Sequence, residues 1–211
     1  MKIILAGAWL HPMYEEASYH ALQELGAKVI VYNWGYLYRN FLSRFEVKYS
    51  IRGPFLNKLN KDLLSKVYEE KPDILLIWLG SPIYPETLDE IKLKTVVKLI
   101  SYVHDDPFAH GFNNLSPSYY KWHWRFLKNS LKFYDLSLFS KQINVDDAHD
   151  VGAKKSFISK QYFVPKIHKP IALTQEEKIF YGCDVVFAGH FEPDGRDEYL
   201  LALSEAGISV T

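Results

Sequence analysis

The sequence contains a single cysteine, Cys183, in 211 residues. One cysteine excludes an internal disulfide framework and is typical of a reducing compartment. No apolar run approaches the roughly 18 residues that a membrane-spanning helix needs. Met1 and Lys2 lead directly into a strand-like run, which is not the pattern of a signal peptide. We therefore expect a cytoplasmic protein without a transmembrane segment.

An excess of charge of one sign is also missing. The 25 basic residues balance the 25 acidic ones, so the chain has no electrostatic footprint for nucleic acid. With 48% hydrophobic and 24% charged residues, the composition is ordinary for a globular protein with a sizeable core. We expect no nucleic-acid partner.

The loop after the first expected strand lacks the glycine spacing of a dinucleotide fingerprint. In that fingerprint a second and a third glycine let the backbone approach a pyrophosphate and let helix and strand pack closely. Trp9 and Leu10 stand where small residues would be needed. Nicotinamide binding is therefore not expected, and no other cofactor is predicted. Gly7 serves either the turn itself or a close approach of the backbone to a sugar or acceptor.

Apolar runs alternate with amphipathic helical stretches along most of the chain. This alternation is the signature of an α/β fold, and continuous apolar runs are typical of parallel strands buried on both faces. We predict a doubly wound, Rossmann-like parallel sheet. The expected strands lie near residues 2–6, 28–32, 73–78, 97–103 and 135–139, and the expected helices near residues 14–25, 37–45, 57–69, 87–93, 118–131 and 143–150.

The strand-glycine-helix opening of this domain occurs a second time near the end of the sequence. Ala21-Leu22-x-Glu24-x-Gly26 returns as Ala202-Leu203-x-Glu205-x-Gly207, after a strand-like run that ends at Gly189. A doubly wound domain needs roughly 100 to 200 residues. We therefore predict a first domain over 1–160, a linker over 161–182 and the truncated opening of a second domain over 183–211. The chain is then part of a longer protein.

The last segment has apolar side chains that require a packing partner. Val185, Phe187, Leu200, Leu201 and Leu203 would pack into a sheet that the sequence does not supply. A lone strand also exposes unpaired backbone groups. We expect residues 183–211 to dock elsewhere on the chain or to self-associate with another copy.

A polar cluster, His104, Asp105 and Asp106, follows the strand that ends at Val103. Open α/β sheets bind ligands at the carboxyl ends of their strands, so we expect this cluster beside the loop of residues 7–11. A histidine base with an orienting carboxylate is one interpretation. A metal site with His110, as in a metal-dependent hydrolase, is the second, although adjacent residues on an extended chain point to opposite sides. The third is structural: the aspartates end the strand and cap the turn before Pro107.

The run from Tyr119 to Phe126 is rich in aromatic residues and invites comparison with a sugar-stacking surface. At helical spacing Tyr119, Trp122 and Phe126 share one face and are expected in the core. His123 or Trp124, on another face, could line a cleft. Near the second opening, the run from Gly189 to Arg196 combines a glycine-rich turn, a helix start and an arginine, which are features that hold a diphosphate.

Several motifs resemble, in chain order, the glycosyltransferases of the spore-maturation-protein type (CgeB-like), which are similar to retaining enzymes of the two-Rossmann GT-B architecture. They are Tyr102-Val-His-Asp-Asp-Pro107, Leu138-Phe-Ser-Lys141, Gly152-Ala-Lys-Lys155 with Pro165 and His168-Lys-Pro170, and Asp184-Val-Val-Phe-Ala-Gly189 followed by Arg196. The resemblance implies a parent enzyme whose partners are a nucleotide sugar and an acceptor.

The resemblance also assigns sides of the cleft. Gly7, Trp9 and His11 would bind the acceptor next to the catalytic group His104, Asp105 and Asp106. Gly189, His190 and Arg196 would begin the donor side. The family's later glutamate and basic residues have no counterpart before Thr211, so we expect no turnover from this chain alone. A rival interpretation is a non-catalytic α/β ligand-binding module.

Overall fold

The computed structural model describes residues 1–108, 122–160, 162–189 and 195–211. The chain forms two compact units, Met1–Ile167 and His168–Thr211. His110, Tyr119 and His190, which the sequence singled out, lie outside the described residues.

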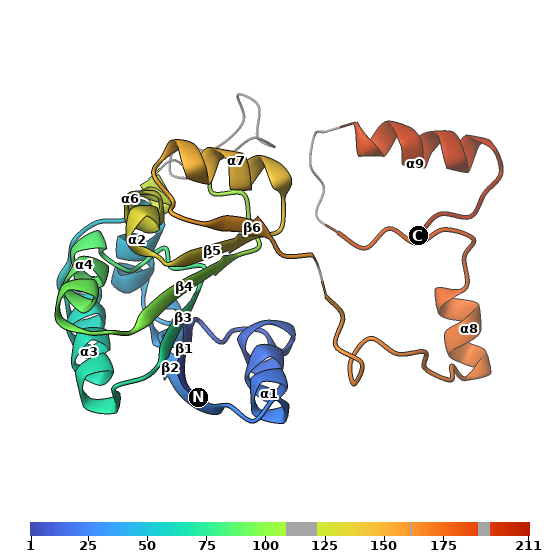
Figure 1. The fold of residues 1–211 in the computed structure, drawn as a ribbon. Helices are drawn as coiled ribbons and strands as arrows, with labels where there is room; N and C mark the ends of the chain where they lie inside the picture. The colour runs from blue at the N-terminus through green and yellow to red at the C-terminus, as the bar shows by residue number, and fades with distance from the viewer. Residues whose placement is uncertain (109–121, 161, 190–194) are drawn as a thin grey trace. The chain divides into compact units, whose positions relative to one another are not determined.

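The first unit is built on a six-stranded sheet in which every pairing is parallel (Figure 1). Its strand order is β2-β1-β3-β4-β5-β6, so β1 lies between β2 and β3. The five predicted strands are confirmed, and a sixth, β6, was missed. Their bounds are β1 Lys2–Gly7, β2 Lys28–Asn33, β3 Ile74–Trp78, β4 Lys98–Val103, β5 Leu136–Phe139 and β6 Ser156–Ile158.

Helices connect the strands and begin where the sequence offers start signals. Proline stands in the first turn of α3 and α4, where its missing N–H costs nothing. Asn40 caps α2, its side chain accepting from the Leu42 N–H at 2.8 Å, so the helix predicted over 37–45 is two elements. The bounds are η1 Pro12–Glu16, α1 Ala17–Glu24, η2 Gly35–Tyr38, α2 Phe41–Tyr49, α3 Pro54–Glu70, α4 Pro85–Lys94, α6 Arg125–Ser130, η3 Leu131–Phe133 and α7 Gln142–Asp150.

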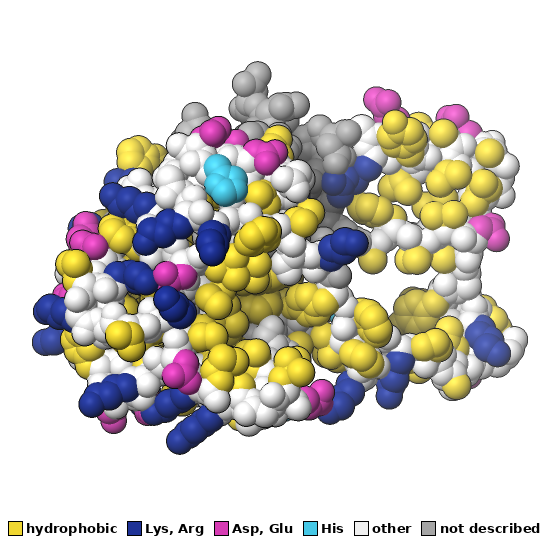
Figure 2. All heavy atoms as spheres, viewed as in Figure 1, with side chains coloured by type: hydrophobic (Ala, Val, Ile, Leu, Met, Phe, Trp, Pro, Cys, Tyr) yellow, Lys and Arg dark blue, Asp and Glu magenta, His cyan; other side chains and the backbone are white. Residues whose placement is uncertain are grey.

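The two faces of the sheet are covered unequally. Figure 1 shows α3, α4 and α6 on one side of the sheet and α1 on the other. Leu75, Ile77 and Leu99, on the face toward α3 and α4, are fully buried. Their neighbours on the opposite face, Leu76 and Ile100, are only half-buried, and Figure 2 shows apolar side chains gathered over the sheet on the face in view.

Helix α1 departs from the expected apolar stripe. None of its residues is buried, and Leu25, just beyond its end, is 84% exposed. A kink at Tyr14, in the single π-helical turn η1, separates the first turn from the rest of the helix. The spacing of Tyr14, Ala17, Ala21 and Leu25 predicted the helix correctly but not its burial, because the periodicity assumed one continuous helix.

The second unit contains α8 (Gln175–Tyr181) and α9 (Arg196–Glu205). A single parallel bridge pairs Val185 with Val210, and none of the unit's described residues is buried. The stretch predicted as a plain linker therefore contains a helix. Its start is a capping box, in which the Thr174 side chain accepts from the Glu177 N–H and Glu177 accepts from the Thr174 N–H.

No helix in the described parts of the chain is long and apolar enough to cross a membrane.

Candidate functional site

The carboxyl edge of the sheet brings together residues that are far apart in the sequence. Strands β1, β3 and β4 are parallel, so the loops after Gly7, Trp78 and Val103 emerge on the same side. The His104 ring centroid lies 4.6 Å from that of Tyr14 and 6.0 Å from that of Trp78. The predicted histidine thus contacts the segment that follows the Gly7–His11 loop.

Glu15 closes the loop after β1. Its carboxylate is buried, with 3% of the residue exposed, and Oε1 accepts the Ala8 N–H at 2.8 Å and the Trp9 N–H at 3.2 Å. A Cβ atom at position 7 would lie 2.3 Å from that oxygen. Gly7 is therefore needed because the chain's own carboxylate packs against it. Its part in acceptor binding stays a prediction.

Two residues at this edge have a strained backbone conformation. Trp9 and Leu79 have φ values of 54° and 64°, a left-handed conformation that residues with a Cβ rarely adopt. Each such residue costs on the order of 1–3 kcal/mol and persists where the surroundings hold it, often at a binding site. The indole Nε1 of Trp9 is buried without a hydrogen-bond partner among the described residues.

His104 and Asp105 are held through their backbones. The His104 carbonyl accepts the Ser140 hydroxyl at 2.7 Å, and the Asp105 carbonyl accepts from the Asn144 Nδ2 at 3.2 Å. His104 Nε2 lies 3.8 Å from Asp105 Oδ1, beyond a hydrogen bond, and its Nδ1 is buried without a partner in the described residues. The Asp105 side chain is 47% exposed. The two side chains therefore lie close to each other but do not form a hydrogen bond.

Asp106 has a different environment from its two neighbours. It is 5% exposed, and its Oδ1 accepts the Phe108 N–H at 3.1 Å, forming the turn that leads out of β4. Lys141 Nζ lies 3.8 Å from Oδ2. These contacts are those of the structural alternative, in which an aspartate caps the turn before Pro107.

Tyrosine hydroxyls surround the cluster and stay protonated at neutral pH. Burial, reinforced by the charges of Glu15 and Asp105, raises the pKa of Tyr38 to about 12. Burial, with the nearby Tyr102, raises the pKa of Tyr162 to about 12, and the Tyr162 hydroxyl donates to the Met13 carbonyl at 2.6 Å. Burial also raises the pKa of Tyr102. Protonated hydroxyls such as those of Tyr38 and Tyr102 can donate a hydrogen bond to a ligand without adding charge, whereas Tyr162 uses its one O–H on Met13.

The other predicted site residues are dispersed. His11 is exposed, with its ring centroid 5.5 Å from that of Tyr14. Gly189 and Arg196 belong to the second unit, where the Arg196 guanidinium lies 5.7 Å from the Phe187 ring at the start of α9. Among the described residues no group of three His, Cys, Asp or Glu side chains could hold a metal ion.

Sequence reasoning missed Glu15, Tyr38 and Trp78 as members of this edge. Glu15 appeared only as part of a helix, because nothing in its spacing reveals a carboxylate turned back onto loop amides. Trp78 at the end of an apolar run was interpreted as core. Its position as the last residue of a parallel strand was the available signal.

Comparison with known proteins gives no match to a protein-family model and none to curated protein sequences. Solved structures do match. The fold is of the GT-B type. UGT73P12 of Glycyrrhiza uralensis, a GT-B glycosyltransferase complexed with glycyrrhetinic acid 3-O-monoglucuronide, aligns with 99% of this chain at a TM-score of 0.53 and 13% identity. UDP-N-acetylglucosamine 2-epimerase from Rickettsia bellii aligns with 100% of it at a TM-score of 0.54 and 14% identity.

This GT-B-type chain spans 55% of the length of the first structure and 61% of the second. At such low identity the likeness concerns the fold alone.

Proposed function

We propose that this chain forms the acceptor side, and the beginning of the donor side, of a glycosyltransferase of the spore-maturation-protein type that transfers a sugar from a nucleotide sugar to an acceptor hydroxyl. The observation that supports this most is the position of His104 and Asp105. They stand at the carboxyl edge of a parallel sheet, against the segment that follows β1. Parallel α/β sheets bind their ligands at that edge.

Within the predicted catalytic group the three residues take different roles. Asp105, half-exposed and fixed through its carbonyl, accepts the proton of the acceptor hydroxyl. His104, whose Nε2 lies 3.8 Å from Asp105 Oδ1, packs against Tyr14 and forms the side of the site toward the β1 loop. Asp106 holds the turn through Phe108. Trp9 and His11 line the approach to the edge from the β1 loop, and Gly7 shapes that loop.

The domain roles follow from the same proposal. Residues 1–160 face the acceptor, 161–182 link the domains, and 183–211 open the donor side, with Gly189, His190 and Arg196 nearest the diphosphate. Stabilising a departing diphosphate needs several donors preorganised in a closed cleft. A chain that spans 55% and 61% of the two solved structures is therefore expected to bind nucleotide sugars weakly and to show no turnover alone. The cytoplasmic location stays a prediction.

The test compares the isolated chain with the full-length gene product. Calorimetry on the 211-residue chain with UDP- and GDP-sugars should show weak binding or none. In the full-length product, transfer of labelled sugar should occur, and Asp105→Asn should lower kcat by roughly 10²- to 10⁴-fold. Asp150→Asn, on the exposed end of α7, is the matched control. Unchanged kcat in Asp105→Asn, or tight stoichiometric donor binding by the isolated chain, would contradict the proposal.

A further inference from the structure

A cavity of about 720 Å³ opens beside Asp105 in the first unit. Its volume lies in the range of roughly 300 to 1,000 Å³ that small-molecule sites occupy. Half of the residues that line it have large aromatic side chains: Tyr38, Phe41, Phe45, Tyr49 and Trp124. Flat apolar walls of this kind favour a ring-shaped ligand.

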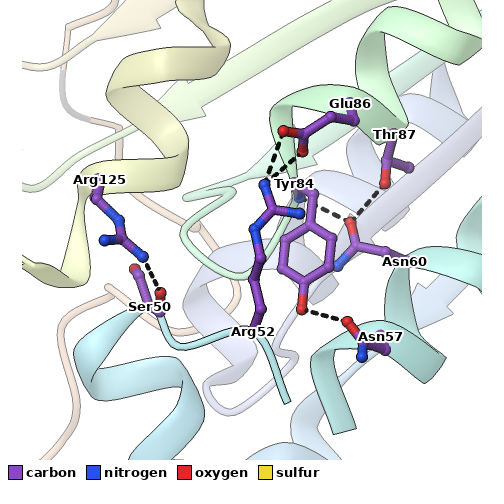
Figure 3. A network of polar contacts seen from close by, with 8 residues as sticks. All are labelled: Ser50, Arg52, Asn57, Asn60, Tyr84, Glu86, Thr87 and Arg125. Carbon is purple, nitrogen blue, oxygen red and sulfur yellow. Dashed lines mark hydrogen bonds and ion pairs between the residues drawn. The ribbon is translucent and has the colours of Figure 1, made fainter. Parts of the chain in front are cut away.

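The wall of the cavity is already fixed by hydrogen bonds. The His123 Nδ1–H donates to the Val47 carbonyl at 3.2 Å, and the Ser50 hydroxyl donates to the His123 carbonyl at 3.0 Å. Arg125 donates to the Ser50 carbonyl at 2.6 Å, as Figure 3 shows. The carboxyl end of α2 is thereby tied to residues 123–125, so a ligand would find the cavity preformed.

A second set of contacts braces the segment after α2. Arg52 donates to both carboxylate oxygens of Glu86, at 2.7 and 2.8 Å, and lies over the Tyr84 ring at 4.7 Å (Figure 3). Asn60 receives the Tyr84 N–H at 2.7 Å and the Thr87 hydroxyl at 2.9 Å. This network anchors the start of α4 to α3 and to the segment that follows α2.

One end of the cavity offers hydrogen-bond acceptors. A carbonyl can only accept, so Nδ1 of His123 must hold the proton, and Nε2 of the neutral ring is an acceptor without a hydrogen-bond donor among the described residues. Burial lowers the pKa of His123, which keeps the ring neutral. The Asp105 carboxylate lines the same cavity. Two acceptors that line one cavity favour a ligand that donates, such as a hydroxyl group.

The α2 wall of the cavity offers positive charge. Arg44 and Lys48 lie four residues apart on α2, are exposed, and line the cavity. Residues at this spacing are neighbours on a helix surface. An arginine and a lysine together select an acidic group, which arginine binds through paired hydrogen bonds.

We propose that this cavity binds a ring-shaped molecule with a hydroxyl group directed to Asp105 and His123 and an acidic group directed to Arg44 and Lys48. The inference that this molecule is the sugar acceptor rests on the proposed function. The inference that the cavity is a binding site does not.

The test uses the whole chain and two probes, para-hydroxybenzoate and para-coumarate, in calorimetric titrations. At least one should bind saturably at one site. Its methyl ester, without the acidic charge, and its methyl ether, without the hydroxyl proton, should each bind roughly tenfold more weakly, as expected for the loss of one charge-assisted hydrogen bond. No saturable binding by either probe, or binding of the ester and the ether as tight as that of the parent acid, would overturn the proposal.

Two pairs of variants assign the ends of the cavity. Arg44→Gln with Lys48→Gln should weaken binding of the acid but leave binding of its ester unchanged, whereas Lys28→Gln with Lys61→Gln, at exposed positions on β2 and α3, should change neither. His123→Asn keeps an N–H near the Nδ1 position for Val47 and removes the Nε2 acceptor, so it should abolish the preference for the hydroxyl over the ether. His123→Gln is its counterpart, with an amide reaching the Nε2 position, and should retain part of that preference.

Binding and transfer then separate the two proposals. Probe binding that follows this pattern in a full-length product without any transfer would contradict the proposed function alone. Transfer whose KM for acidic acceptors is insensitive to Arg44→Gln with Lys48→Gln would contradict the cavity assignment alone.

Discussion

The chain contains two similar openings whose packing differs completely. Ile3, Ile4 and Leu5 of β1 are 2%, 0% and 0% exposed, whereas Val186 and Phe187, at equivalent places before the second Ala-Gly pair, are 70% and 37% exposed. β1 has a partner strand along both edges. The second opening has a single bridge between Val185 and Val210.

The comparison teaches that an apolar run makes a strand but does not make a core. Burial of an apolar side chain stabilises in proportion to the area removed from water, and that area is supplied by neighbouring strands and helices. In the first unit β2, β3 and α3 supply it. In the second unit the described residues supply none, although the local sequence plan is the same.

The largest expected difference concerns the equivalent positions 4 and 186. Ile4→Ala should lower the free energy of unfolding of the chain by about 2–5 kcal/mol, because it leaves a cavity in a filled core. Val186→Ala should change it by less than about 0.5 kcal/mol, because the side chain is already in water. Urea unfolding followed by far-UV circular dichroism, which reports on the helices of both units, measures both. A similar cost for the two variants would show that the second opening has a core of its own.

A smaller difference is expected between two carboxylates that each accept backbone N–H groups. Glu15 is buried and Asp184, which accepts the Ser209 N–H at 2.9 Å, is exposed. Glu15→Ala should cost about 1–3 kcal/mol, because the amides of Ala8 and Trp9 lose their acceptor in a buried loop. Asp184→Ala should cost less than about 0.5 kcal/mol, since water replaces the acceptor. Equal midpoints of urea unfolding for the two variants would contradict this account of the β1 loop.

The exposed apolar side chains of the second unit should make the chain self-associate. We expect a concentration-dependent dimer in sedimentation equilibrium, and Val186→Lys with Phe187→Lys should raise its dissociation constant by at least about tenfold, or roughly 1.4 kcal/mol. Val96→Lys, at a residue of the first unit that is 95% exposed, is the control. A strictly monomeric chain with rapid amide exchange throughout residues 183–211 would contradict the expectation that this segment packs against the first unit or another copy.

The smallest effect concerns acid. Hydrogen bonds from Lys2 and Lys66 lower the pKa of Glu70 from 4.5 to about 2. A carboxyl group whose pKa is lower in the folded state stabilises above its unfolded pKa, and this contribution is lost as the pH falls from about 4.5 toward about 2. Glu70→Gln should therefore flatten the dependence of the urea midpoint on pH in that window.

Glu177 is the corresponding carboxyl group in the second unit, and its protonation should affect only the helix that it caps. Two hydrogen bonds with Thr174 lower the pKa of Glu177. The larger effect comes from the backbone N–H of Thr174 and the smaller one from its side chain. Protonation of Glu177 should reduce the helix content of α8, seen by NMR chemical shifts, without moving the urea midpoint of the first unit. A midpoint that responds equally to Glu70→Gln and Glu177→Gln would contradict this division.

Most of the fold could be predicted from the sequence because long apolar runs identify buried parallel strands. Strand β6 could not, since three residues flanked by lysines and serines give no periodicity. Helix α8 was missed although Thr174 and Glu177 form a capping box, because the surrounding prolines and charges suggested a linker. The burial of α1 was overestimated because the kink at Tyr14 is a tertiary effect.

The candidate site was predictable in part. The position of His104 and Asp105 at the sheet edge followed from parallel topology, and the sequence indicated that His123 or Trp124 could line a cleft. Glu15 and the Arg44–Lys48 pair were not recognised, because their importance depends on which loop amides and which cavity they reach. Side-chain direction across an irregular loop has no signature in residue spacing.

The position of β1 between β2 and β3 has a consequence for biosynthesis. Lys2 donates its N–H to Asp73 Oδ2 at 2.6 Å, across 71 residues of sequence. At about 5–20 residues per second, β1 waits roughly 4–14 s after its own synthesis before β3 is made. During that interval one edge of this apolar strand has no partner. Substitutions that slow elongation between Asn33 and Asp73 should therefore reduce the yield of folded chain without altering its stability.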